Sequence, residues 1–305
     1  MIKTLKHILG ISILLTSITV GRAQHSFSFN NEPVLAKYQD SLVALNSLIL
    51  ASENNASRFE HNAAFIKTLV NALKTPFSFA FPFDSLKTIS VVKSSDNALR
   101  IFSWSVPADD GSYRFFGAIQ MATTDGQLKL YPLIDQTDNL KTPYEVTDHQ
   151  RWYGARYYEI GFVPGIKPYY VLLGWKGNDQ KTTKKVIEVL SFEKDLPVFG
   201  KPVFEGSKSV ASKNRIIFEY NKLNSMTLTI DKSVNLLVFD HLAPFTPDME
   251  GNFEYYASDL SFDAFKFVNS KLRLVENVEL KNEPNEMDDF YIDPEDKSTT
   301  HVKKL

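Results

Sequence analysis

The fold is decided by residues 100–133, which read RIFSWSVPADDGSYRFFGAIQMATTDGQLKLYPL. Three short runs within this stretch, at 100–106, 113–121 and 128–133, are rich in aromatic and β-branched residues and alternate with period two. Asp-Asp-Gly at 109–111 and Thr-Asp-Gly at 124–126 separate the runs and favour tight turns. The pattern predicts an antiparallel β-meander.

The same texture continues to the C-terminal side. Further predicted strands cover 157–163, 169–175, 186–192, 215–220, 226–230, 235–239, 262–268 and 272–278. No unit of about 20 to 50 residues repeats, which disfavours a regular propeller. We therefore expect a sandwich or an irregular meander, with an irregular propeller or a barrel as the alternative.

The segment before Pro76 has a helical period instead. Apolar residues recur at steps of three and four between 32 and 52, and again between 59 and 73, with Glu53-Asn54-Asn55 between the two runs. Proline disfavours helix at the residue before it, so the second helix is expected to stop before Pro76. The sequence thus predicts a helical hairpin packed on a large antiparallel β domain, an α+β fold that is mainly β.

The N-terminus has the features of a secretory signal peptide. Lys3 and Lys6 precede an apolar run at 8–20, and the small residues of Gly21-Arg22-Ala23 follow it. We expect cleavage before Gln24 and export to the periplasm or the medium. The predicted division is a signal peptide at 1–23, a helical hairpin at 24–75, a β domain at 76–281 and a disordered acidic tail at 282–305.

Composition restricts the partners. The chain has no cysteine, which excludes disulfides, thiolate metal sites and a lipidated N-terminal cysteine. Its formal charge is −2, and the tail at 282–305 has seven acids against three lysines, so the predicted β domain and hairpin together are close to neutral. A nucleic-acid partner is therefore not expected. No later run reaches the roughly 18 apolar residues of a membrane span, so no membrane insertion is expected either.

Aromatic residues give the first candidate site. Trp152, Tyr153 and Tyr157 cluster in sequence beside Arg151 and Arg156, and Trp175 lies on a nearby predicted strand. Rings with a polar edge suit stacking on sugars or peptides. The competing interpretation, which we favour, is that these rings fill the core of an aromatic-rich sheet.

Acidic residues give the second candidate. Asp240 and His241 end one predicted strand, and Asp259 and Asp263 follow later in the chain. Carboxylates with an imidazole suit general acid/base work. Their spacing matches no metal motif, and capping or turn hydrogen bonds explain the same residues. We therefore predict no metal site, and the absence of a phosphate-cradling glycine loop predicts no cofactor.

Several strings resemble a known family. RIFSW at 100–104, WYGARYY at 152–158, LGWKGND at 173–179, FDHL at 239–242 and SFDAFKF at 261–267 together resemble a family of uncharacterised exported proteins of Gram-negative bacteria. The resemblance runs from about Phe59 to about Val278. It implies export and a shared fold, and it assigns no activity and no catalytic residue.

The sequence favours two functions above others. The first is a non-catalytic binding or structural module of the cell envelope, which export, aromatic richness and missing catalytic motifs favour. The alternative is a secreted hydrolase that acts on glycans or peptides through loop carboxylates. The oligomeric state and the ligand follow from neither hypothesis.

Overall fold

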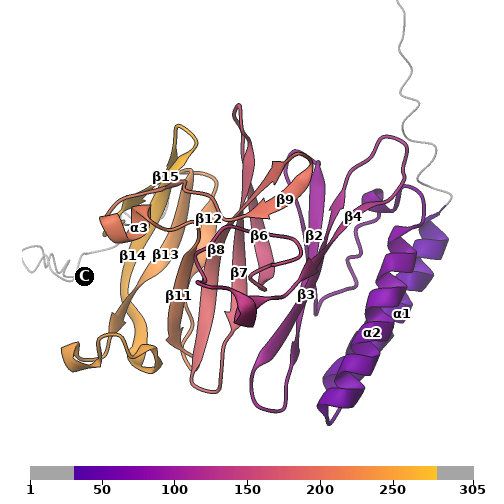
Figure 1. The fold of residues 1–305 in the computed structure, drawn as a ribbon, viewed down its shortest axis with the longest axis horizontal. Coiled ribbons are helices and arrows are strands. Elements are labelled where there is room, and N and C mark those ends of the chain that lie inside the picture. The colour runs from indigo at the N-terminus through magenta and orange to yellow at the C-terminus, as the bar shows by residue number, and fades with distance from the viewer. Residues whose placement is uncertain (1–30, 280–305) are drawn as a thin grey trace, which may run out of the picture.

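The chain stacks its elements in four layers. The structure is a computed structural model that describes residues 31–279. One pair of helices and three β-sheets follow one another (Figure 1), and the chain passes through them in sequence order except that β10 joins the third sheet before β11 returns to the middle sheet. Three hydrophobic clusters fill the spaces between successive layers. The predicted fold class, α+β and mainly antiparallel β, is confirmed, with the sheets stacked as a sandwich.

The helical layer is an antiparallel pair, α1 (Glu32–Ala51) and α2 (Asn55–Leu73). Asn54 caps α2, because its side-chain oxygen accepts a hydrogen bond from Ser57 N at 3.0 Å. The stripe of Leu35, Leu42 and Ile49 on α1 is buried, as the three-and-four spacing predicts. Within residues 31–279, no helix combines the length and the apolarity needed to cross a membrane.

The first sheet has the strand order β1-β2-β3-β4 and contains the predicted meander. Its strands are β1 (Ser90–Lys93), β2 (Leu99–Pro107), β3 (Tyr113–Met121) and β4 (Lys129–Ile134), and a 3-10 helix, η1 (Ser78–Ala80), precedes them. Alternate side chains of β2 point to opposite sides of the sheet, and both sides of this strand are buried. Phe102 and Trp104 pack toward the helices, whereas Leu99 and Ile101 pack toward the next sheet.

The middle sheet has the order β5-β9-β8-β7-β6, and β11 also pairs with β8. Its strands are β5 (Thr147–Asp148), β6 (Arg156–Val163), β7 (Tyr169–Gly177), β8 (Thr182–Glu193), β9 (Leu196–Phe199) and β11 (Ile216–Asn221). A second 3-10 helix, η2 (Thr137–Asn139), lies in the connection that leads to β5. Both faces of this sheet are covered, so nearly every residue of β7 is buried.

The third sheet has the order β10-β15-β14-β13-β12, and only its β10–β15 pairing is parallel. Its strands are β10 (Phe204–Glu205), β12 (Leu228–Asp231), β13 (Leu236–Pro244), β14 (Tyr256–Val268) and β15 (Lys271–Val275). The short helix α3 (Lys208–Ala211) lies between β10 and β11 of the middle sheet, and η3 (Pro247–Met249) and η4 (Phe253–Tyr255) lie between β13 and β14. The predicted signal peptide and the predicted acidic tail lie outside the described residues.

Candidate functional site

A hollow of about 300 Å³ opens where the helices, the first sheet and the middle sheet meet. Strand β7 contributes Trp175, β6 contributes Arg156, β3 contributes Tyr113 and β2 contributes Trp104, while the end of α1 forms the remaining wall. Ligand pockets usually enclose about 300 to 1,000 Å³ and are lined by aromatic side chains with a few polar groups. The hollow meets both conditions at the lower end of the volume range.

A cation lies over an aromatic ring inside this hollow. Arg156 and Trp175 are cross-strand partners in the β6–β7 register, which places their side chains next to each other. The guanidinium carbon of Arg156 lies 5.6 Å from the centre of the Trp175 ring, a cation–π distance. Among the residues that the structure describes, Arg156 forms no ion pair. Its charge is therefore available to a ligand.

Tyr113 forms the second aromatic wall. Its ring meets the Trp175 ring edge to face, with the centroids 5.2 Å apart and the planes at 84°. Gly177 makes this contact possible, because a Cβ atom at that position would lie 2.3 Å from Tyr113 Cδ2. The ammonium group of Lys222 lies 5.6 Å from the Tyr113 ring centre and adds a second cation beside this wall.

The helical wall supplies polar groups. Asn46 is a buried polar residue of α1, and its side-chain amide donates to Thr88 Oγ1. Trp104 Nε1 donates to Asn62 Oδ1 of α2 at 2.7 Å, which fixes the indole at the floor of the hollow. These hydrogen bonds satisfy groups that would otherwise be buried without partners. The walls are thus held in place before any ligand arrives.

Behind Trp175 lies a buried lysine. Lys176 Nζ donates to Gly154 O at 2.6 Å and to Thr137 Oγ1 at 2.9 Å, and it lies 4.4 Å from the ring centres of both Phe115 and Tyr153. Burial disfavours the charged form and lowers the pKa of Lys176 to about 8. The lysine therefore ties the irregular connection after β4 to the middle sheet.

A buried ion pair holds the other end of that connection. Arg215 Nε donates to Glu188 Oε2 at 2.6 Å, and both side chains are fully buried. The same guanidinium donates to the carbonyl oxygens of Pro143 and Glu145. Burial raises the pKa of the Glu188 carboxyl, and the Arg215 charge opposes that rise. The irregular stretch 135–150 is thus fastened to the core at both ends.

Three of the four aromatic candidates lie inside the core. Trp152 and Tyr157 are wholly buried and Tyr153 is nearly so, and Trp152 Nε1 donates to Tyr157 Oη at 2.8 Å. Burial raises the pKa of Tyr157 well above its ordinary value. Tyr157 lies on β6, and Trp152 lies shortly before that strand; both rings belong to the cluster between the first sheet and the middle sheet. Trp175, near the end of β7, is the one of these four that reaches the hollow.

The structure brings together some of the acidic candidates. His241 Nδ1 lies 2.9 Å from Asp263 Oδ2, and this hydrogen bond raises the pKa of His241. Asp240 instead accepts from Thr227 N at 2.9 Å, and Asp259 accepts from Ser261 N and Oγ in a turn. Within residues 31–279, no group of three His, Asp or Glu side chains is placed to hold a metal ion.

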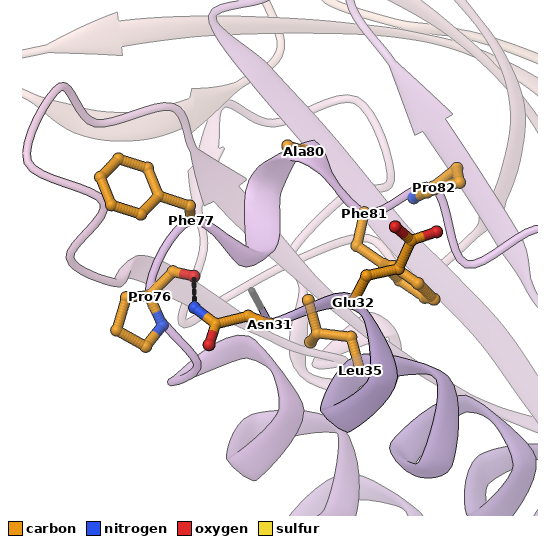
Figure 2. A pocket seen from close by; sticks show the side chains of 8 residues that line it. All are labelled: Asn31, Glu32, Leu35, Pro76, Phe77, Ala80, Phe81 and Pro82. Carbon is orange, nitrogen blue, oxygen red and sulfur yellow. Dashed lines mark hydrogen bonds between the residues drawn. The ribbon is translucent and has the colours of Figure 1, made fainter. Parts of the chain in front are cut away.

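A smaller hollow lies at the start of α1. Figure 2 shows Asn31 donating to the carbonyl oxygen of Pro76 across it, at 3.1 Å. Its volume of about 160 Å³ is below the usual range of ligand pockets. Leu35 and Phe81 on its wall both belong to the core between the helices and the first sheet. We interpret it as a packing gap where the helical pair joins the sheet.

The sequence patterns do not predict most of the residues that line the hollow at Arg156 and Trp175. Tyr113 and Trp104 lie in the meander that the sequence predicts, but no local pattern connects them to Trp175, which is more than 60 positions away. Arg156 and Trp175 could have been paired from the register of β6 against β7, which places these two residues opposite each other. No protein-family model, no curated protein and no solved structure matches this chain.

Proposed function

We propose that the chain is an exported, non-catalytic binding module of the cell envelope, and that the Trp175–Arg156 hollow holds its ligand. The ligand class is a small molecule with one flat or apolar ring face and one carboxylate or phosphate group. An indole face and a phenol ring favour the ring, and an unpaired guanidinium favours the anion.

One observation carries the proposal. Arg156 is partly buried, stacks on Trp175 and forms no ion pair with a described residue, although it lines a hollow of ligand size. A partly desolvated cation without a counter-charge gains from any anion that enters. Export is supported by the arrangement of Lys3, Lys6 and the apolar run that follows them.

The test is a binding screen on the chain that begins at Gln24. Aromatic carboxylates and acidic sugars are compared with their neutral amide or alcohol counterparts, and tryptophan fluorescence and calorimetry report binding. We expect anionic ring compounds to bind and R156Q to weaken them by about tenfold or more, because a hydrogen bond to a charged group is lost. W175F should reduce the fluorescence response, and Trp104 of the same hollow accounts for the part that remains.

The matched control is R114Q. Arg114 lies on β3 and is largely exposed, and its ion pair with Asp138 at 3.4 Å lies at the surface. This variant loses the same charge outside the hollow, so it should bind like the parent chain. Equal binding of neutral and anionic compounds, or equal losses in R156Q and R114Q, would contradict the proposal.

A second candidate, the hydrolase, rests on the contact between His241 and Asp263. A carboxylate that orients an imidazole is one part of a general-base arrangement. Glycan, peptide and ester substrates test it directly, with H241N and D263N as the variants. Turnover that both substitutions abolish would favour the hydrolase over the binding module, and no turnover by the parent chain would end this alternative.

A further inference from the structure

Another hollow, of about 740 Å³, lies between the middle sheet and the third sheet. Three connections form it: the turn from β6 to β7 at 164–168, the link from β9 to β10 at 200–203 and the turn from β14 to β15 at 269–270. Tyr169 begins β7 and lines this hollow, whereas Trp175 lies near the other end of the same strand. The two hollows are therefore at opposite ends of β7.

Hydrogen bonds between the three connections fix its shape. Tyr169 Oη donates to Ser270 O at 3.1 Å, and Lys271 Nζ donates to Pro202 O at 2.7 Å. Asn269 and Ser270 both have left-handed backbone angles, φ 49° and 58°, as the two central residues of a type I′ hairpin turn require. A site whose walls are fixed in advance loses little conformational entropy when a ligand binds.

The charge in this hollow is of one sign. Lys167, Lys201 and Lys271 line it, and no acidic side chain is among its lining residues. Lys201 is partly buried, yet neither its ammonium group nor that of Lys167 has a hydrogen bond or an ion pair within residues 31–279. Three like charges around one hollow repel each other until an anion enters.

An exposed apolar residue lies at the rim. Ile166 is fully exposed at the tip of the β6–β7 turn, next to Lys167. Soluble proteins expose single apolar residues often, so Ile166 alone indicates nothing. Beside three lysines, however, it offers an apolar contact to a molecule whose phosphates occupy the hollow.

We propose that this hollow is a binding site for a ligand with several phosphate groups. Lysine ammonium groups are compact point charges with three donors each, which suits phosphate oxygens without demanding one planar geometry. The volume and the three separate cations favour more than one phosphate. Soluble polyphosphates and the headgroups of anionic lipids share this chemistry.

The experiment uses two probes on the chain that begins at Gln24. Tripolyphosphate binding is measured by calorimetry, and co-sedimentation is measured with vesicles of phosphatidylcholine that contain phosphatidylglycerol, with pure phosphatidylcholine as reference. The double variant K167Q/K201Q leaves the Lys271 contact to Pro202 in place. We expect it to weaken binding of at least one probe by about tenfold or more.

The matched control is K37Q/K67Q, which removes two exposed lysines from α1 and α2 and changes the net charge equally. It should bind both probes like the parent chain. I166S separates the two sources of phosphate: weaker vesicle binding with unchanged tripolyphosphate binding assigns the hollow to lipid headgroups, whereas unchanged binding of both probes assigns it to soluble phosphates. Absence of binding to both probes, or equal losses in the two double variants, would overturn the proposal.

Discussion

Arg215 and Glu188 form an ion pair that solvent does not reach, with Arg215 Nε 2.6 Å from Glu188 Oε2 and neither side chain exposed. Glu188 lies on β8, in the middle of the central sheet, whereas Arg215 immediately precedes β11. The pair therefore joins two strands and, through the carbonyl of Glu145, the connection that leads to β5. Loss of the ion pair should therefore destabilise both the contact between the two strands and the connection to β5.

We expect E188Q and R215M each to lower the free energy of unfolding by about 3 to 5 kcal/mol, because each leaves one buried charge without a partner. The double variant should lose less than the sum of the two, since no unpaired charge remains. Denaturant unfolding measures all three. Breaking the exposed Arg114–Asp138 pair by R114Q is the reference and should change stability by less than about 1 kcal/mol.

Lys176 predicts a pH-dependent stability. Burial lowers its pKa from 10.5 to about 8, so between these values the unfolded chain binds the proton and the folded chain does not. The contribution of this group to the free energy of unfolding should therefore rise as the pH increases from about 8, and the full rise of about 3 kcal/mol is reached near pH 10.5. The difference between the parent chain and K176M, measured from pH 7 to 9.5, isolates it.

K129M is the control for Lys176, because Lys129 is exposed on β4. The parent chain and K129M should gain stability in parallel across this pH range, while K176M should not. A K176M curve that runs parallel to the parent curve would show that the buried ammonium is not the titrating group.

His241 predicts a contribution to stability that falls as the pH rises. Its hydrogen bond to Asp263 raises its pKa above the ordinary value of about 6.5, so protonated His241 is favoured in the folded chain. The stabilisation is complete below about pH 6.5 and disappears as the pH rises through the raised pKa. An NMR titration should show D263N lowering the pKa of His241. D259N should lower it less, because Asp259 acts only through its charge.

Packing of the helical pair is tested on α1. Leu42 is fully buried against the first sheet, whereas Leu48 on the same helix is 47% exposed. L42A should lower the free energy of unfolding by about 2 to 5 kcal/mol, because it leaves a cavity, and L48A should change it by less than about 1 kcal/mol. Similar effects of both substitutions would mean that the helices do not pack as described.

Periodicity predicts the two long helices and most of the strands that the structure describes, but it does not predict the short strands β1, β5, β9 and β10. The three-and-four spacing of Leu35, Tyr38, Leu42, Leu45 and Ile49 predicts the apolar face of α1, and the alternation at 100–133 predicts β2, β3 and β4. Strand ends were less well predicted: β8 begins at Thr182 and β14 at Tyr256, both earlier than expected. Propensity is weak at strand ends, where pairing with a neighbouring strand decides whether a residue remains extended.

The sequence by itself determined the two long helices and the longer strands, because helical and strand periods depend only on neighbouring residues. Tertiary structure decided which polar and aromatic groups face solvent. Trp152 and Trp175 are both candidates by sequence, yet the packing of the sheets buries the first and leaves the second at a hollow. Lys167, Lys201 and Lys271 are far apart in a nearly neutral chain, and three connections from two sheets bring them together. Such contacts between distant residues depend on long-range packing, which local sequence patterns do not predict.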